Sequence, residues 1–229
     1  RDGRAMTMGG REVKLARHGF ARKQEWKLEE QGDSMVALSL SSADHAELLE
    51  QYPYPFKIVA RYTIDSEKVA VSYEVSNEGT EDMPFFVGGH PGFKCPLDEG
   101  ESYDDYELRF EQREAAELCT AVPSTGLIDV EHRSKNPMIG QNLPLTHELF
   151  DFAETIFDVL ESRVVTLIKK TEDKGVRLTF PDMPYLIVWA SPRATLWPWN
   201  RGAACPPAPT RTIFWSTSVA AWWLSLIHI

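Results

Sequence analysis

The sequence predicts an all-β protein built as a large antiparallel sandwich. Apolar and polar residues alternate with a period of two over most of the chain, which is the pattern of strands with one buried face. Short polar turns separate these segments at intervals of roughly ten residues. Helical periodicity is scarce, so the chain lacks the crossover helices that parallel strands need. These observations favour antiparallel strands over repeated β-α-β units.

The strands are expected where the alternation is clearest. In 69–76 the odd positions are large and apolar and the even ones small or polar, which predicts a half-buried strand. Similar strands are expected at 35–40, 56–64, 106–110, 164–168 and 176–180. Polar turns separate them at 65–67, 77–79 and 173–175. Only 43–51 and 146–150 could form a turn or two of helix.

Length and composition limit the possible functions. The 229 residues can bury a sizeable core, and 43% hydrophobic and 25% charged residues are typical of a globular protein. The net charge of −10 argues against nucleic acid or an anionic membrane as partner, because both bind basic patches. Three widely spaced cysteines without a Cys-x-x-Cys pair favour neither a disulfide framework nor zinc. A cytoplasmic location is therefore expected.

The chain changes character near Pro192. Residues 193–229 contain no Asp or Glu, although the chain has 34, and they hold five of the seven tryptophans. We therefore expect one domain at 1–192 and an aberrant tail at 193–229. A membrane anchor is the competing interpretation of the tail, because 212–229 is an uncharged run of eighteen residues.

His90 is the first candidate for chemistry, in the run Phe85-Phe86-Val87-Gly88-Gly89-His90-Pro91-Gly92-Phe93. Its glycines leave room for a ligand, and Pro91 fixes the direction in which the chain leaves. An imidazole with a pKa of about 6.5 is a usable proton donor near neutrality. A turn histidine with a local hydrogen bond is the alternative interpretation. We expect His90 to transfer a proton to an uncharged substrate.

His18 and Glu154 are weaker candidates. His18 stands in Arg17-His18-Gly19-Phe20-Ala21-Arg22, again beside glycine and an aromatic residue, but it could simply cap a strand. Glu154 lies in 149–158, where acids interleave with bulky apolar residues, and a surface carboxylate is the alternative. The sequence contains no paired histidines at metal-ligand spacing, no Gly-x-Ser-x-Gly elbow and no phosphate-binding glycine loop. We therefore expect neither a metal nor a cofactor.

Three ordered motifs resemble the aldose 1-epimerase (galactose mutarotase) family, above all its bacterial mutarotase-like branch. They are His18-Gly19-Phe20-Ala21-Arg22, Tyr52-Pro53-Tyr54-Pro55-Phe56, and Gly88-Gly89-His90-Pro91-Gly92-Phe93 followed by Cys95-Pro96-Leu97. The resemblance covers residues from about 10 to 190. It implies a truncated sandwich of the galactose-mutarotase type, the supersandwich, and an enzyme that interconverts the α and β anomers of a hexose.

The resemblance also implies roles for individual residues. His90 corresponds to the general acid that protonates the ring oxygen, and His18 to the histidine that orients the substrate. Glu154 lies where the family places a sugar-binding aspartate, three residues before an aromatic. Arg22 and Trp189 correspond to the wall of the pocket. The family's reaction needs no metal or organic cofactor. The partner that the resemblance implies is a monosaccharide.

The family's base, a glutamate in a Glu-Pro-Trp motif after the strand that here ends at Trp189, is missing. No Glu occurs after Glu172. However, Trp199-Asn200-Arg201-Gly202 can be encoded TGG-AAC-CGT-GGN, which reads Glu-Pro-Trp from the third base. We therefore hypothesise a frameshift between about Trp189 and Thr195, in a fragment that also lacks N-terminal strands. The nucleotide sequence across codons 185–229 tests this, and a frame without Glu-Pro-Trp near codon 199 rules it out.

A fragment without its base, and with unpaired strand edges, is expected to fold poorly and to have little or no mutarotase activity. A sugar-binding or sugar-sensing protein on the same fold, without turnover, is the main alternative. A β-sandwich carbohydrate hydrolase or lyase is a further one, but it needs paired carboxylates that cannot be assigned. Galactose, glucose and a hexose 6-phosphate are all compatible with the sequence, as is any oligomeric state.

Overall fold

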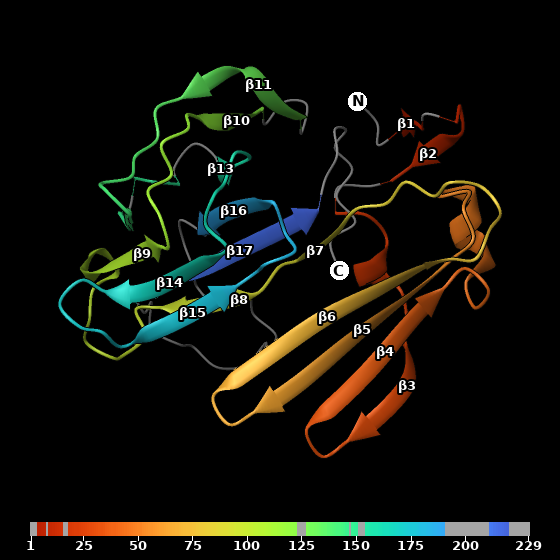
Figure 1. Ribbon diagram of the computed structural model, residues 1–229, viewed down its shortest axis with the longest axis horizontal. Helices are drawn as coiled ribbons and strands as arrows, with labels where there is room; N and C mark the ends of the chain where they lie inside the picture. The colour runs from red at the N-terminus through yellow and green to blue at the C-terminus, as the bar shows by residue number, and fades with distance from the viewer. Residues whose placement is uncertain are drawn as a thin grey trace, which may run out of the picture. The chain divides into compact units, whose positions relative to one another are not determined.

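Antiparallel strands make up nearly all of the regular structure. The computed structural model describes residues 4–7, 9–15, 18–122, 127–146, 148–150, 154–190 and 211–219, of which 4–6, 127 and 211–219 as backbone alone. Within these residues the chain forms strands β1 to β17 and three short 3₁₀ helices, η1 to η3 (Figure 1). Each strand pair whose register is described is antiparallel. The predicted all-β antiparallel fold class is confirmed.

The chain divides into two compact units, which meet in sequence between Val87 and Gly88. The strands of the first unit are β1 (Arg4–Met6), β2 (Glu12–Lys14), β3 (Lys27–Gly32), β4 (Met35–Ser41), β5 (Phe56–Asp65) and β6 (Lys68–Asn77). Its helices are η1 (Ala21–Lys23) and η2 (Ala46–Glu50). Strands β3 to β6 form a four-stranded sheet in chain order, and β1 pairs with β2. Two-residue turns at 33–34 and 66–67 join neighbouring strands, and Ser66 has a positive φ of 43°.

The core of the first unit is an aromatic cluster at one end of this sheet. Phe20, Tyr52, Tyr54 and Phe56 are each 4% exposed. The ring of Phe20 lies 5.4 Å from that of Phe56, and the ring of Tyr52 lies 5.2 Å from that of Tyr54. Tilted rings at such distances gain more than burial alone provides. The Tyr52 hydroxyl donates to the Pro84 carbonyl at 2.7 Å, so this buried polar group is satisfied.

The second unit contains two sheets. Its strands are β8 (Gly92–Cys95), β9 (Tyr106–Phe110), β10 (Leu118–Val122), β11 (Leu127–Ser134), β12 (Asn142–Pro144), β13 (Thr155–Phe157), β14 (Val164–Lys169), β15 (Gly175–Thr179), β16 (Tyr185–Ala190) and β17 (Arg211–Val219). The single helix among its described residues is η3 (Tyr103–Asp105), and β7 (Val87–Gly89) spans the sequence boundary between the units. One sheet has the order β11-β10-β13-β16-β17-β7, with β8 also paired to β17. The other has the order β12-β9-β14-β15.

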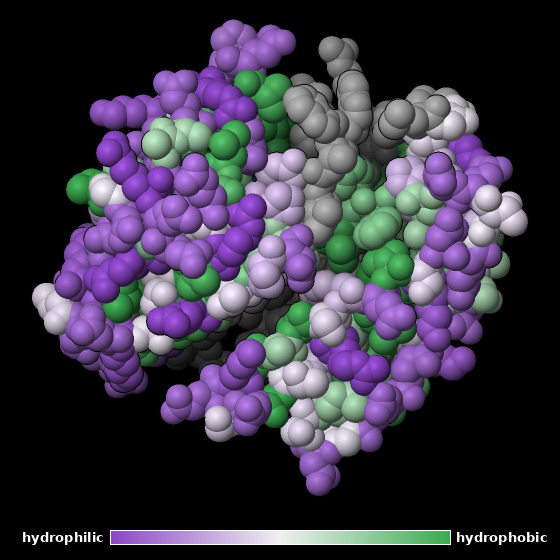
Figure 2. Space-filling view, viewed as in Figure 1, coloured by the Kyte–Doolittle hydropathy of each residue, from purple (hydrophilic) through white to green (hydrophobic). Residues whose placement is uncertain are grey.

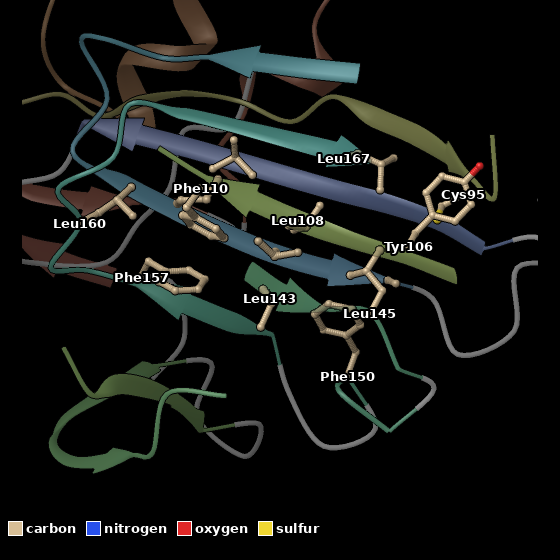
Figure 3. Close-up of a cluster of buried hydrophobic side chains, with 14 of the residues drawn as sticks. Cys95, Tyr106, Leu108, Phe110, Leu143, Leu145, Phe150, Phe157, Leu160 and Leu167 are labelled. Atoms are coloured by element: carbon tan, nitrogen blue, oxygen red, sulfur yellow. The ribbon is translucent and has the colours of Figure 1, made fainter. Parts of the chain in front are cut away.

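Side chains from both of these sheets form one buried cluster (Figure 3). Leu108 of β9 and Leu167 of β14 are fully buried in it, together with Leu186 of β16. Phe157 of β13 is 1% exposed, and its ring lies 5.0 Å from the ring of Phe110. Because this cluster takes residues from both sheets, the second unit is a sandwich with the core between its layers.

The six strands expected from alternation are all present, as β4, β5, β6, β9, β14 and β15. The expected half-burial of 69–76 is wrong for its first residues, because Val69 is 64% and Val71 43% exposed. Only Tyr73 and Val75, farther along β6, pack on the aromatic cluster. Helix in 43–51 is limited to η2, and the described part of 146–150 contains a turn.

None of the helices in the described part of the chain has the length and hydrophobicity of a membrane span. Of the competing anchor segment, 212–219 belongs to strand β17. Apart from β17, the tail lies outside the described residues. The proposed aberrant origin of the tail stays a prediction, as does the single domain at 1–192.

Candidate functional site

His90 is presented by the link between two short strands. It follows β7, precedes β8, and is exposed. Both β7 and β8 pair with β17, so the same neighbour holds the chain on either side of the histidine. Val87 and Gly88 are buried, which fixes the approach to the link. The imidazole is therefore the exposed end of a segment that is anchored on both sides.

A polar network fixes the chain beyond β8. The Leu97 amide donates to the Tyr106 hydroxyl at 3.1 Å, and that hydroxyl donates to Glu101. Lys169 Nζ donates to Glu101 at 2.6 Å. The hydrogen bond from Lys169, with that from Tyr106, lowers the pKa of Glu101, while burial raises the pKa of Tyr106 to about 12. Near neutral pH the Glu101 carboxylate therefore stays ionised and the Tyr106 hydroxyl stays protonated, so the hydrogen bonds of this network are kept.

His18 has an unusual backbone conformation. Its φ is 70° and that of Gly19 is 63°, so two successive residues lie in the left-handed region. This conformation is costly for a residue with a side chain and persists only where the surroundings enforce it. Phe20, two residues after His18, is buried in the aromatic cluster, which anchors the chain directly after this turn. Arg22, in η1, is exposed.

Trp189 lies on β16, and Glu154 lies immediately before the adjacent strand β13. The register of β13 and β16 pairs Thr155, the residue after Glu154, with Val188, the residue before Trp189. Along β16 the even-numbered residues are buried and the odd-numbered ones are partly exposed. Trp189 therefore lies on the partly exposed face of β16, and Glu154 is itself partly exposed.

This pairing extends across the sheet to the strand that follows His90. Trp189 pairs with residue 214 of β17, and residue 214 pairs with Gly92 of β8. Trp189 and Gly92 therefore belong to one row across β16, β17 and β8, and Glu154 adjoins the next strand, β13. Two strand spacings separate Trp189 from Gly92, on the order of 10 Å. His90 is two residues before Gly92 in the chain.

The five predicted site residues thus fall into two groups. His90, Glu154 and Trp189 belong to the second unit, where each lies on or next to a strand of the same sheet. His18 and Arg22 belong to the first unit. Among the described residues, no group of three or more His, Cys, Asp or Glu side chains is arranged to hold a metal ion.

A hollow in the first unit was not expected from the sequence. It has a volume of about 470 Å³, and residues on its wall include Arg11, Pro53, Tyr54, Asn77 and Glu81. The Arg11 guanidinium lies 5.5 Å from the centre of the Tyr54 ring, 2.5 Å from Glu81 and 2.9 Å from the Pro53 carbonyl oxygen. The motif Tyr52-Pro53-Tyr54-Pro55-Phe56 contributes residues to this wall and is visible in the sequence. Arg11 is far from this motif in the chain, so the sequence does not indicate that the two meet. With its guanidinium already bound on three sides, Arg11 stabilises the wall.

The second unit also holds a tight ion pair beside a buried thiol. Arg133 donates to both carboxylate oxygens of Asp158, at 2.9 and 2.7 Å. Burial raises the pKa of Asp158, but the hydrogen bonds from Arg133 and Cys119 outweigh it and leave this pKa below its ordinary value. Burial raises the pKa of the Cys119 thiol to about 12, and that of Cys95 equally. Neither thiol is ionised near neutrality, which argues against nucleophilic thiol chemistry at these positions.

The lowered pKa of Asp158 predicts a pH-dependent contribution to stability. Its folded pKa is below the unfolded one, so the contribution is full above the unfolded pKa of about 3.9 and is lost as pH falls through the folded pKa. Asp158→Asn should therefore lower the free energy of unfolding at pH 7, and the deficit should shrink toward pH 3. Urea denaturation of both proteins at several pH values measures this, and a deficit independent of pH would contradict it.

Comparisons with known proteins agree with this architecture. A family model described as aldose 1-epimerase matches residues 2–204. The plasmid and chromosomal forms of protein LacX from Lactococcus lactis are each 39% identical to the chain over 191 residues, covering 81% of the chain. A galactose mutarotase-like protein from Lactobacillus casei superposes with a TM-score of 0.74 at 26% identity, over 94% of this chain and 68% of that one. A galactose mutarotase related enzyme from Lactobacillus acidophilus superposes with a TM-score of 0.72 at 22% identity, over 95% and 66%.

Fold and comparisons define a large antiparallel β protein of the galactose mutarotase-like class. The chain belongs to the aldose 1-epimerase family. It spans 63% of the length of the two LacX relatives.

Proposed function

We propose that this chain is part of an aldose 1-epimerase-like enzyme that binds a hexose and interconverts its anomers. His90 is the general acid and His18 orients the sugar. Glu154, Arg22 and Trp189 bind it. The observation that carries this proposal is the row of Trp189 and Gly92, with His90 two residues before Gly92 and Glu154 immediately before the neighbouring strand β13. We further propose that the enzyme acts in the cytoplasm.

The arrangement suits a sugar because it offers three kinds of contact on one sheet. A carboxylate at one end accepts hydrogen bonds from hydroxyl groups. The indole of Trp189 offers an apolar face with a polar edge. The imidazole at the other end is exposed and can donate a proton near neutral pH.

In the proposed reaction, His90 gives its proton to the ring oxygen as the bond from that oxygen to the anomeric carbon breaks. A base removes the proton of the anomeric hydroxyl, and the electrons of that O–H bond form the carbonyl. Rotation about the adjacent carbon–carbon bond and reversal of these transfers give the other anomer. General acid–base catalysis of this kind contributes typically about 10²–10⁴-fold.

The base is the missing component, since no Glu follows Glu172 and no acid of either kind follows Asp182. Polarimetry on freshly dissolved α-D-glucose and α-D-galactose should therefore give a rate close to that of buffer. A large rate above buffer would contradict the assignment of the base to the absent glutamate.

The same absence favours one alternative, a protein that binds or senses sugar without turnover. The two proposals differ once the reading frame is restored so that Glu-Pro-Trp follows β16. An enzyme should then turn over the sugar and lose this turnover on substitution of His90. A binding protein should show only weaker affinity.

A further inference from the structure

The two outer strands of the first unit's sheet differ in how they are protected. Among the described strands, β3 and β6 each have a neighbour on one side only. Strand β3 carries Lys27, Glu29 and Glu30, and its register with β4 shifts between Leu28 and Glu30. Charges and bulges of this kind prevent an edge from pairing with another chain. Strand β6 pairs with β5 in an unbroken register over ten residues and has only two charges, Lys68 and Glu74.

The hydrogen-bonding groups on the free side of β6 can be identified. The Glu78 amide donates to the Pro55 carbonyl at 2.9 Å, immediately beyond the last strand pair. In an antiparallel pair, alternate residues direct their backbone groups to the same neighbour. The backbone N–H and C=O groups of the even-numbered residues of β6 therefore bond to β5. Those of Val69, Val71 and Tyr73 point away from β5, toward the free side of the strand. These groups form a regular row that a further strand can bind.

The two charged residues of β6, Lys68 and Glu74, favour a second copy of β6 as the partner strand and favour one alignment of the two copies. If a second β6 pairs antiparallel with Val71 opposite its own copy, Val69 lies opposite Tyr73 and Lys68 lies opposite Glu74. Symmetry makes the Lys68–Glu74 pair twice. Outward-facing residues then oppose one another, as the hydrogen-bond pattern requires. Neither Lys68 nor Glu74 has an ion-pair partner among the described residues, so both are available.

Exposed apolar side chains extend this surface. Val69 is 64% and Val71 43% exposed, and Ile64, opposite Val69 on β5, is 59% exposed. All three lie on one face of the sheet, and in Figure 2 hydrophobic side chains surface among hydrophilic ones where β4 to β6 run. Cross-strand contacts between Val71 and its copy, and between Val69 and Tyr73, would cover part of this apolar surface.

We propose that the free edge of β6 is a homodimer interface, in which two copies of this chain join their sheets around a two-fold axis at Val71. Pairing of β6 with itself uses the free β6 edge of each copy. The protected β3 edges of the two copies then prevent this sheet from adding further chains. The assembly therefore closes at two copies.

Sedimentation velocity of the full chain over about a hundredfold range of concentration tests the interface, because dimerisation depends on mass action. We expect a monomer–dimer equilibrium. Lys68→Glu sets glutamates opposite one another in both pairs and should weaken the dimer about tenfold or more, as should Glu74→Lys. The double variant Lys68→Glu/Glu74→Lys restores both pairs and should restore the dimer. Lys27→Glu, a matched change on the exposed β3 strand, should have no effect.

Any of the following outcomes would overturn the proposed interface. A monomer at every concentration means that β6 is not a self-pairing edge. A dimer unaffected by Lys68→Glu uses another surface, and particles larger than a dimer contradict closure. Failure of the double variant to recover the dimer, while its circular dichroism matches that of the native chain, removes the proposed register. Val71→Lys gives a second check, because it places two lysines at the axis and should also yield monomer.

Discussion

Phe157→Ala is expected to lower the free energy of unfolding by about 3–5 kcal/mol, the range for truncation of a buried aromatic side chain. Phe157 is 1% exposed, lies in the cluster between the two sheets, and has its ring 5.0 Å from that of Phe110. The substitution removes apolar contacts and leaves a cavity bounded by two sheets, which cannot both move inward. Urea denaturation followed by tryptophan fluorescence measures the loss.

Val159→Ala is the matched control, two residues farther along the chain. Val159 is 55% exposed, so its truncation should change the free energy of unfolding by no more than about 0.5 kcal/mol. A loss below about 1 kcal/mol for Phe157→Ala would mean that the two sheets do not share this core.

His90→Ala should have the largest effect on chemistry. In a chain whose restored reading frame supplies Glu-Pro-Trp, we expect kcat to fall by about 10²–10⁴-fold, the usual contribution of a general acid. The change in KM should be smaller, because the proton is transferred only in the transition state. Coupled assays or polarimetry at several sugar concentrations separate the two constants.

His132→Ala controls for the loss of any exposed imidazole. His132 is an exposed histidine whose Nδ1 lies 2.9 Å from Asp129, on strand β11. Its substitution should leave kcat unchanged. Equal effects of the two substitutions, or a His90→Ala enzyme with full kcat, would remove His90 from the reaction.

Local sequence patterns predict the long strands well. Alternation places β4, β5 and β6 almost to the residue, because a strand with one buried face must alternate. Alternation does not predict which residues of β6 are buried, because their burial depends on how far the aromatic cluster extends over the sheet. The pattern of Val69 and Val71 is the same as that of Tyr73 and Val75, yet only the last two pack on the cluster.

The candidate site could be predicted residue by residue but not as an arrangement. The motif around His90 indicates an exposed imidazole, and the structure exposes it. The placement of Trp189 and Gly92 in one row, next to the strand that follows Glu154, depends on the registers of three separate strand pairs, which join segments far apart in the chain. No local pattern encodes such pairings. One of the strands, β17, lies in the supposedly aberrant tail, where β-branched and aromatic residues favour a strand whatever their origin.

The central claim is that His90 faces a bound hexose, and NMR of the histidine side chains tests it most directly. D-galactose and D-glucose are added to the chain as it stands, with the imidazole signals assigned through His90→Ala and His132→Ala. We predict that the His90 signals move and saturate with at least one of the two sugars, while the His132 signals stay in place. His90 signals that do not change at any sugar concentration, or that move together with those of His132, would contradict the account.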